Sequence, residues 1–306
     1  MIRRFAVACA QIATVCVVLS VLLPLVPVWP LVLFEHFRWH YVPVAFAVVA
    51  AAGALRLCRG WFDVAAIAAL LDLVAVAPDL ATSTHALPAA GTPLRVLILN
   101  VHTESTGYAH VRQLIADTNP DVIGLVEVSR HWLDELAPAT AAYTHRLEET
   151  RDDNFGVALY AREPFAGEIE ALGSQLPSAV AAFDRVSIIL THPLPPVSGR
   201  ALTAMYEQFD AVAARARELG PHVLVMGDFN ATPWSRPFHR LVAASGLCDT
   251  RAGFGVQASF PTAPSLVRIP IDHVLASCAI GVRDRRIERD VGSDHLPVVV
   301  DLVIPR

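Results

Sequence analysis

Hydrophobic and polar residues divide the chain into two unlike parts. No residue is charged in Phe5–Phe34, and two further apolar runs follow at Tyr41–Leu55 and Val64–Ala77. A membrane-spanning helix needs about 20 mostly apolar residues, which the first run supplies by about Val26. The two later runs are shorter, and a short apolar run alone is equally typical of a buried core helix. Because the three runs follow one another with short linkers, we predict three transmembrane helices that place residues 5–80 in a lipid bilayer.

The edges of these runs carry the residues that membrane interfaces favour. Amphipathic aromatic rings prefer the boundary between lipid and water, and four of them flank the runs: Trp29, Trp39, Tyr41 and Trp61. A cleaved signal peptide is the rival interpretation of the first run. The apolar region is too long for one, and no small-residue cleavage site precedes the second run. The pattern therefore favours a membrane anchor that stays attached to the chain.

Arginines in the short loops predict the orientation of this anchor. Arg3 and Arg4 precede the first run, and Arg56 and Arg59 lie between the second and the third, whereas the remaining loop has Arg38 alone. Positive residues collect on the cytoplasmic side of short loops. We therefore predict a multi-pass protein of the plasma (inner) membrane with a cytoplasmic N-terminus. After three crossings, everything beyond residue 80 would be extracytoplasmic.

Asp72 and one pair of cysteines each leave two interpretations open. Asp72 lies within the third apolar run, where an ionisable residue indicates a function by default but can also serve packing through an interhelical hydrogen bond. Cys248 and Cys278 are the only cysteines of the outer part. An oxidising compartment permits a disulfide between them, and two buried free thiols fit the sequence equally well.

After a linker over residues 81–93, the pattern changes to that of a globular domain over residues 94–306. Short apolar runs alternate with helical patterns, which is typical of a layered α/β sandwich with a mixed sheet. The predicted strands are Leu94–Val101, Val122–Val126, Gly156–Ala161, Val186–Thr191, His222–Met226, Ile271–Ala276 and Leu296–Val303. The predicted helices are Tyr108–Asp117, Ala201–Leu219 and Trp234–Ala244.

Polar residues that could bind a metal ion or take part in catalysis lie at the ends of these strands. They are Asn100, Glu127, His192, Asp228, Asn230, Asp272, Asp294 and His295. One such residue at the end of a buried strand is more often a cap or turn residue. Six strand ends that all carry a carboxylate, a carboxamide or an imidazole are hard to explain as turns. Because strand ends on one side of a sheet converge, we expect these side chains to form one site.

The residue types at these ends favour a hard metal ion. Asn100, Glu127 and Asp294 offer oxygen ligands, which suit Mg²⁺ or Mn²⁺ better than zinc. The sequence has no HExxH motif and no closely spaced Cys/His set that would indicate a zinc site instead. We therefore predict these three residues as metal ligands and Mg²⁺ or Mn²⁺ as the cofactor.

The remaining residues fit acid–base chemistry beside such a metal. His192 and His295 can move a proton or contact a phosphate oxygen near neutral pH, and Asp272 can orient the ring of His295. Asp228 would orient or deprotonate a water molecule, and Asn230 would donate to an oxyanion. Together these roles predict metal-assisted attack of water on a phosphoester.

Composition and charge narrow the range of functions. Hydrophobic residues make up 54% of the chain, which excludes low-complexity disorder. All basic residues are arginine, which excludes chemistry that needs a lysine, such as a Schiff base or a P-loop phosphate clamp. Beyond residue 90 the formal charge is −6, from nineteen arginines and twenty-five acids. A nonspecific nuclease usually has a positive surface, although local arginines could still form a basic rim: Arg151, Arg162, Arg185, Arg200, Arg236 and Arg268.

Seven segments in a fixed order carry a resemblance to a known family. NVHTES, VIGLVEV, GVALYAR, THPLPP, GDFNATPWS, IDHVLAS and GSDHLPV resemble the motifs of the endonuclease/exonuclease/phosphatase superfamily, with its DNase I-like fold, over residues 94–304. The resemblance implies an α/β (α+β) fold, a four-layer α-β-β-α sandwich, here preceded by the three-helix anchor. With such an anchor, the chain is similar to a bacterial membrane-anchored branch of that superfamily.

The resemblance also implies roles for individual residues. Glu127 would be the principal metal ligand with Asn100 beside it, and Asp294 would lie near the metal. Asp228 and Asn230 would act on the nucleophile and the transition state. His192 would contact the phosphate. Asp272 and His295 would form a pair that transfers a proton. Four departures from the pattern are Val126 in place of the usual Gln, an additional imidazole at His273, the loop residue His102, and no recognisable acid to support His192.

We therefore predict a membrane-anchored, divalent-metal-dependent phosphohydrolase, either a phosphodiesterase or nuclease or a phosphatase. Its partners would be the bilayer and a phosphoester, which could be nucleic acid, a phospholipid head group or a small molecule; no protein partner is predicted. The alternative is a non-catalytic membrane protein that uses the same fold as an interaction surface. A decayed enzyme tends to lose Glu, Asp or His from its site, and none of the matched positions is lost here.

Overall fold

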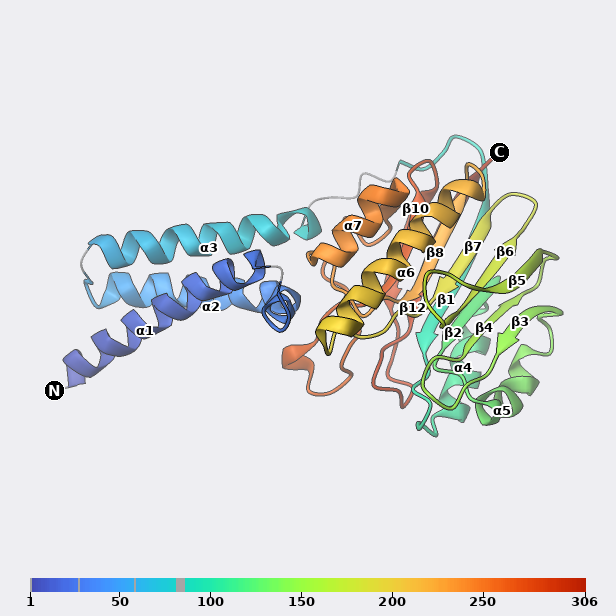
Figure 1. The fold of residues 1–306 in the computed structure, drawn as a ribbon, viewed down its shortest axis with the longest axis horizontal. Helices are drawn as coiled ribbons and strands as arrows, with labels where there is room; N and C mark the ends of the chain where they lie inside the picture. Colours follow the sequence, from blue (N-terminus) through green and yellow to red (C-terminus); the bar gives the residue numbers. More distant parts are fainter. Residues whose placement is uncertain (1, 27, 58, 81–85) are drawn as a thin grey trace.

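The computed structural model describes residues 2–26, 28–57, 59–80 and 86–306. Three helices lie side by side, and an α/β sandwich stands at one end of them (Figure 1). The helices are α1 (Ile2–Leu22), α2 (Arg38–Ala54) and α3 (Arg59–Leu80). Two 3₁₀ turns, η1 (Leu23–Leu25) and η2 (Leu31–Phe37), connect α1 to α2.

The three helices contact one another through small residues and turn large apolar side chains outward. Ala45, Ala65 and Ala69 are buried between them, whereas Ile12 and Ile67 are exposed. This distribution is the reverse of a water-soluble bundle and is typical of helices in lipid, where small residues allow close contact. Among the described residues, two helices are long and apolar enough to cross a membrane, Arg3–Leu22 and Arg59–Ala77. The 17-residue α2, which contains Pro43, is not one of them, so the third span of the anchor stays a prediction.

Asp72 of α3 has a hydrogen-bond partner on another helix. The Ser20 hydroxyl of α1 donates to Asp72 Oδ2 at 2.9 Å, and both side chains are buried. Of the two interpretations that the sequence leaves open for Asp72, the structure favours the interhelical bond. This hydrogen bond between buried side chains links α1 to α3.

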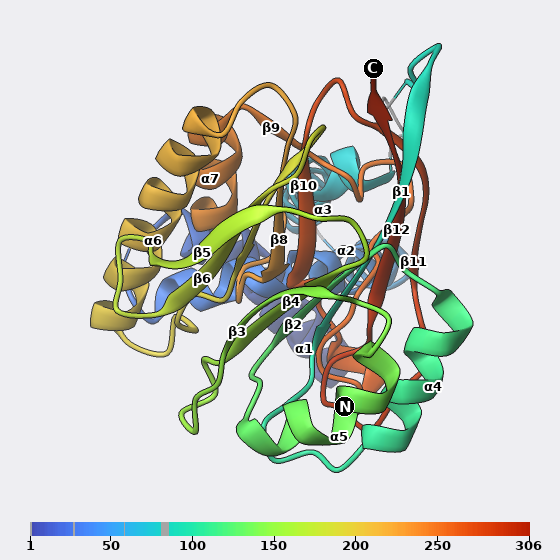
Figure 2. The same ribbon diagram turned by 90° about the vertical axis from the view of Figure 1, so that its right-hand side faces the viewer.

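The sandwich contains two six-stranded sheets that face each other (Figure 2). The first has the order β11 (Gly281–Ile287), β12 (Val298–Pro305), β1 (Gly91–Asn100), β2 (Val122–Val126), β4 (Val157–Ala161), β3 (His145–Glu149). The second has the order β5 (Ala166–Ala171), β6 (Pro177–Ala182), β7 (Ser187–Thr191), β8 (Val223–Asp228), β10 (Asp272–Ser277), β9 (Leu247–Asp249). The α/β sandwich predicted from the apolar pattern is therefore confirmed.

Helices cover the outer face of each sheet and complete a four-layer arrangement. The first sheet packs against α4 (Tyr108–Thr118) and α5 (Arg130–Thr140), and the second against α6 (Gly199–Glu218) and α7 (Arg236–Ser245). A separate core of valine, leucine, isoleucine, alanine and one methionine, Met226, fills the space between the sheets. Strands buried on both faces are apolar at nearly every position, which is why β2 and β8 are readable in the sequence.

The topology brings the polar strand ends to one end of the sandwich. Each sheet has one parallel pair at its centre, β1 with β2 and β7 with β8, so the carboxyl ends within each pair lie together. The antiparallel strand β10 begins at this same end, because Asp272 is the register partner of Asp228.

Two details of the outer part differ from, or extend, the sequence-based expectations. Strand β1 begins at Gly91, paired with Pro305, so three residues of the expected linker belong to the sheet; residues 81–85 of that linker lie outside the described residues. Cys248 and Cys278 form a disulfide with a Cα–Cα distance of 5.1 Å. The bond ties edge strand β9 to the turn that follows β10.

Candidate active site

A cavity of about 500 Å³ opens where the polar strand ends meet. Six of the eight predicted residues line it: Glu127, His192, Asp228, Asn230, Asp294 and His295. The other two, Asn100 and Asp272, are buried directly behind it and contact residues of the wall. The structure thus brings the eight predicted residues to one place.

Asn100 and Glu127 meet across the ends of β1 and β2. Asn100 Nδ2 donates to Glu127 Oε1 at 2.8 Å and to Asp228 Oδ2 at 3.1 Å. Glu127 has a positive φ of 61° directly after β2, a conformation that is uncommon outside glycine. The Thr103 hydroxyl donates to the Glu127 carbonyl at 2.9 Å and supports this turn. The strained backbone aims the Glu127 carboxylate back across the strand ends.

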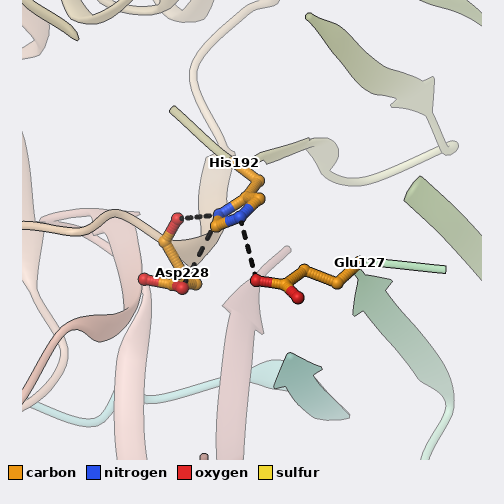
Figure 3. Close-up of side chains that lie close together, drawn as sticks. All are labelled: Glu127, His192 and Asp228. Carbon is orange, nitrogen blue, oxygen red and sulfur yellow. Dashed lines mark hydrogen bonds and ion pairs between the residues drawn. The ribbon is translucent and has the colours of Figure 1, made fainter. Parts of the chain in front are cut away.

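His192, which follows β7, lies between two carboxylates (Figure 3). Its Nδ1 donates to the Asp228 carbonyl at 3.0 Å and is 3.6 Å from Asp228 Oδ2, while its Nε2 is 3.6 Å from Glu127 Oε1. The aromatic ring of Phe155 packs over the imidazole, with ring centroids 5.3 Å apart. The sequence shows no acid to support His192, and the structure supplies two of them.

His295 also lies between two carboxylates, those of Asp272 and Asp228. Its Nδ1 donates to Asp272 Oδ2 at 2.9 Å, and its Nε2 is 3.6 Å from Asp228 Oδ2. Phe260 packs against the ring at a centroid distance of 4.6 Å. One nitrogen of His295 is therefore fixed by Asp272, and the other is directed toward Asp228 and the cavity.

Asn230 and Asp294 lie nearer the mouth of the cavity. Asn230 has a φ of 50°, and its Nδ2 donates to the Pro193 carbonyl at 3.0 Å. Its backbone N–H donates to Asp228 Oδ1 at 2.8 Å, which orients that carboxylate. Asp294 is part-exposed and pairs with His102, whose Nδ1 is 3.2 Å from Asp294 Oδ1. His102 is thus a hydrogen-bonded loop residue that also lines the cavity.

Burial and mutual charge shift the acidities of this cluster. Burial raises the pKa of the Asp228 carboxyl, and the charges of His295 and His192 only partly oppose this. Burial alone would also raise the pKa of Glu127 and of Asp272. Hydrogen bonds from His192 and Asn100 and the charge of His192 hold the pKa of Glu127 below its usual value. The charge and the hydrogen bond of His295 do the same for the pKa of Asp272. Asp228 is therefore the carboxyl of this group that is suited to accept a proton.

For the two imidazoles, burial and the neighbouring carboxylates have opposite effects on the pKa. Burial lowers the pKa of His295, but the charges of Asp272 and Asp228 outweigh it and raise the pKa to about 10. Burial likewise lowers the pKa of His192, and Asp228 together with Glu127 raises it above its usual value. Both rings thus favour the protonated form, in which each nitrogen is a donor.

The side chains present fit a divalent cation. Ligand atoms of Glu127, His192 and Asp228 lie within 4.8 Å of one another, as do those of Asp228, Asp272 and His295. Buried carboxylates need a compensating positive charge; the two imidazoles supply part of it, and among the described residues no arginine lines the cavity. Glu127, Asp228 and Asn100 offer oxygens of the kind that Mg²⁺ and Mn²⁺ prefer. Asn100 turns its amide nitrogen to both carboxylates here, so to act as a ligand it must rotate its amide by half a turn.

None of the six arginines that could form a basic rim is among the residues that line the cavity. Arg162 bonds to Asn119 and Arg185 to Thr92, both at the opposite end of the sandwich. Arg151 pairs with Asp153, and Arg236 with Glu35 of η2. Arg268 donates to backbone carbonyls, and Arg200 is exposed at the start of α6.

Several wall residues carry no clear signal in the sequence. Asp153, Asn154 and Phe155 come from the loop between β3 and β4, and Phe260 from the loop before β10. The polar run RDDNF before a predicted strand is the one local sign of the first group. His273 lies outside the site, as expected for an additional residue, because it alternates with Asp272 to the opposite face of β10. Its ring lies between Phe229 and Phe238, and burial lowers its pKa to about 4.

A protein-family model and several solved structures are similar to this chain. The model of the "Endonuclease/Exonuclease/phosphatase family" matches residues 97–295. A solved endonuclease/exonuclease/phosphatase family protein from Bacteroides thetaiotaomicron is 21% identical, with a TM-score of 0.59 over 71% of this chain and 99% of that one. No curated protein matches the chain.

Two further solved structures are similar in fold. A 3′ phosphatase from Neisseria, bound to a product DNA hairpin, is 19% identical, with a TM-score of 0.56 over 68% of this chain and 98% of that one. A mannosyl-6-phosphatase from Bacteroides thetaiotaomicron is also 19% identical, with a TM-score of 0.56 over 69% of this chain and all of that one (100%). At these identities the likenesses describe the fold of the sandwich.

Proposed function

The chain belongs to the endonuclease/exonuclease/phosphatase family, whose members are hydrolases of phosphoester bonds, and from this premise we propose that it is a membrane-anchored, divalent-metal-dependent phosphohydrolase. The observation that carries the proposal is the buried cluster of three carboxylates and two imidazoles around Asp228. So many ionisable groups are costly to bury unless a site needs them. The complete set of these groups gives the non-catalytic alternative no support.

Each residue has a role that follows from its position. Glu127, with Asn100 beside it, would hold the metal, which when bound polarises a phosphoryl oxygen. Asp228, with its raised pKa, accepts a proton from the attacking water. His192 and His295, both favouring the protonated form, donate to phosphoryl oxygens and to the leaving group.

Three further residues act on these groups or on the substrate. Asp272 fixes the ring of His295 through the bond to Nδ1. Asn230, at the mouth of the cavity, donates to an oxyanion that develops on the phosphoryl group. Asp294, paired with His102, would complete the metal ligands from the rim, as the family motif implies.

The membrane part of the proposal assigns residues 1–80 to the anchor, 81–93 to the linker and 94–306 to the catalytic domain. The two candidate spans and the outward-facing apolar side chains of the helices support it. The disulfide between Cys248 and Cys278 favours an oxidising, extracytoplasmic compartment for the catalytic domain. We therefore propose the plasma membrane with the catalytic domain outside.

A metal titration tests this function directly. The full chain, purified in detergent, is assayed with bis(4-nitrophenyl) phosphate, 4-nitrophenyl phosphate and DNA over a range of Mg²⁺ and Mn²⁺ concentrations. Glu127→Gln removes one charged ligand, so the half-activating metal concentration should rise by about tenfold or more, with partial recovery at excess metal. Glu168→Gln, an exposed site on edge strand β5, is the matched control and should behave as the wild type.

Two results would contradict the proposal. One is the absence of metal-dependent turnover with every substrate by a correctly folded wild-type chain. The other is an unchanged metal dependence in Glu127→Gln, which would remove Glu127 from the metal site.

A further inference from the structure

The segment that joins α1 to α2 contacts a loop of the active-site wall. Trp29, between η1 and η2, donates its indole N–H to the carbonyl of Pro196 at 3.1 Å. The neighbours Pro195 and Val197 line the cavity, and the Cβ of Trp29 lies beside Gly199 at the start of α6. Residues separated by more than 160 positions in the chain therefore meet at the rim of the cavity.

A second contact joins the same segment to the chain that follows Asn230. The Thr232 backbone N–H donates to His36 Nδ1 at 3.4 Å. Glu35 accepts from the Arg236 backbone N–H at 2.7 Å, and its other oxygen is 3.0 Å from Arg236 Nε. Glu35 and His36 are both buried. Together with the Trp29 contact, these bonds hold the segment between α1 and α2 against the end of the sandwich at which the cavity opens.

Large apolar side chains are exposed on this same part of the surface. Val197 at the cavity rim is 67% exposed, and Leu266 of the short turn η3 (Ser265–Val267) is 83% exposed. A groove runs beside Leu266 and is lined on its other side by Phe37 and Trp39, at the start of α2. An exposed leucine alone needs no explanation. Here Val197 lines the cavity, and Leu266 lines a groove shared with the start of α2, the helix end where the predicted bilayer surface falls.

The charge of the cavity argues against a polymer of nucleotides. A nucleic-acid backbone is held by rows of Lys or Arg, and among the described residues no arginine lines this cavity. A single phosphate diester with an apolar remainder fits a cavity that, among the described residues, no arginine lines, and it fits the exposed apolar side chains of Val197 and Leu266.

We infer that the substrate is a phosphate diester in the head group of a lipid, taken from the bilayer that holds the anchor; this inference rests on the proposed function. The rim carrying Val197 and the turn carrying Leu266 contact the lipid surface, and the head group enters the cavity. Water adds its oxygen to phosphorus and one P–O ester bond breaks. The proton lost by the water goes to Asp228, and the leaving oxygen receives a proton from His295. The products are a phosphate monoester and an alcohol, one of which stays in the membrane.

The test compares lipid and soluble substrates in one preparation. The full chain is reconstituted into vesicles of phosphatidylcholine and phosphatidylglycerol, and metal-dependent release of products from the vesicle lipids is measured in both the lipid and the water phase. Turnover of bis(4-nitrophenyl) phosphate and of single-stranded DNA is measured on the same vesicles. We expect lipid turnover to exceed DNA turnover.

A variant at the proposed lipid contact separates binding from chemistry. Leu266→Asp should lower the ratio of lipid turnover to soluble-diester turnover by about tenfold or more, the scale of one leucine side chain leaving an apolar surface. Leu266→Phe should preserve the ratio. Leu87→Asp is the matched control, because Leu87 is also exposed but lies against β11, away from the cavity.

The outcomes separate the two proposals. Turnover of the soluble diester without turnover of vesicle lipid would overturn the lipid inference and leave the proposed function standing, as would faster turnover of DNA than of lipid. An unchanged ratio in Leu266→Asp would overturn the lipid contact. No metal-dependent turnover of any of the three substrates would overturn both the proposed function and the inference.

Discussion

At the scale of single residues, the site depends on partners that fix each ionisable group in one state. His295 could rotate or exchange its proton freely in water. Here its Nδ1–H donates to Asp272 Oδ2 at 2.9 Å, and the surrounding carboxylates raise the pKa of His295 to about 10. Asp272 itself is fully buried and does not reach the cavity wall. It is therefore a positioning residue whose effect passes through His295.

Asp272→Asn should separate proton transfer from metal binding. The amide lacks the charge that holds the protonated imidazole in place, so kcat should fall by about 10²–10⁴-fold, the range for a positioned acid or base. The half-activating metal concentration should stay within about twofold of the wild type, in contrast to Glu127→Gln. Both are measured by metal titrations of turnover. Loss of activity that excess metal restores would show that Asp272 acts on the metal instead.

His273→Gln serves as the contrasting variant. His273 is the next residue in the chain, but it packs behind the sheet and bonds to the Ala231 carbonyl at 2.8 Å. Its replacement should lower the thermal stability and leave kcat close to that of the wild type.

At the scale of elements, the close approach of β7 and β8 brings His192 and Asp228 together. Gly227 has a φ of +140°, and a Cβ at this position would lie 2.1 Å from the carbonyl oxygen of Thr191. Only glycine combines this conformation with this distance. The residues that follow each strand can then meet, with His192 Nδ1 at 3.0 Å from the Asp228 carbonyl. The glycine of the GDFN motif thus shapes the site without touching the substrate.

Gly227→Ala should destabilise the fold by about 2 kcal/mol or more, since it combines backbone strain with a steric clash. Thermal unfolding of the full chain in detergent measures the effect. Gly220→Ala is the matched control, because Gly220 also has a positive φ, of 109°, but nothing lies within 4 Å of the place that a Cβ would occupy there. If both variants lose the same stability, strain alone accounts for the effect and the close approach of the strands does not matter.

At the scale of the whole molecule, the helices and the sandwich share contacts that fix the site at one end of the helices. Glu35 and His36 of η2 bond to the chain after Asn230, and Trp29 bonds to the loop after His192. In the proposed orientation this end is the outer surface of the membrane. The disulfide lies in the same outer part and agrees with an oxidising compartment.

Reporter fusions test this orientation. A reporter that is active only outside the cytoplasm, fused after residue 90, should be active, because three crossings follow a cytoplasmic N-terminus. The same reporter fused after residue 57, between α2 and α3, should be inactive. Activity at residue 57 with none at residue 90 would contradict the proposed topology, because an inverted three-span anchor and a two-span anchor of α1 and α3 both place residue 57 outside and residue 90 inside.

The amino-acid sequence by itself determined the central strands, the residues at their ends and the class of chemistry. Val122–Val126 is predicted and observed with the same bounds, because a strand buried on both faces is apolar at every position. The apolar pattern contains no signal for the four edge strands β3, β5, β9 and β11 or for the small-residue strand β6. Edge strands have one partner and an exposed side, so their residues need not be apolar.

Only the tertiary structure decided which distant residues meet. Sequence reasoning assigned Trp29 and Glu35 to the anchor, yet both bond to the catalytic part. It left Cys248 and Cys278 open, and their pairing follows from the position of β9 beside β10. A residue pattern records the burial that each position experiences within its own element. Contacts between elements depend on the order of strands and the docking of helices, which arise only when the whole chain has folded.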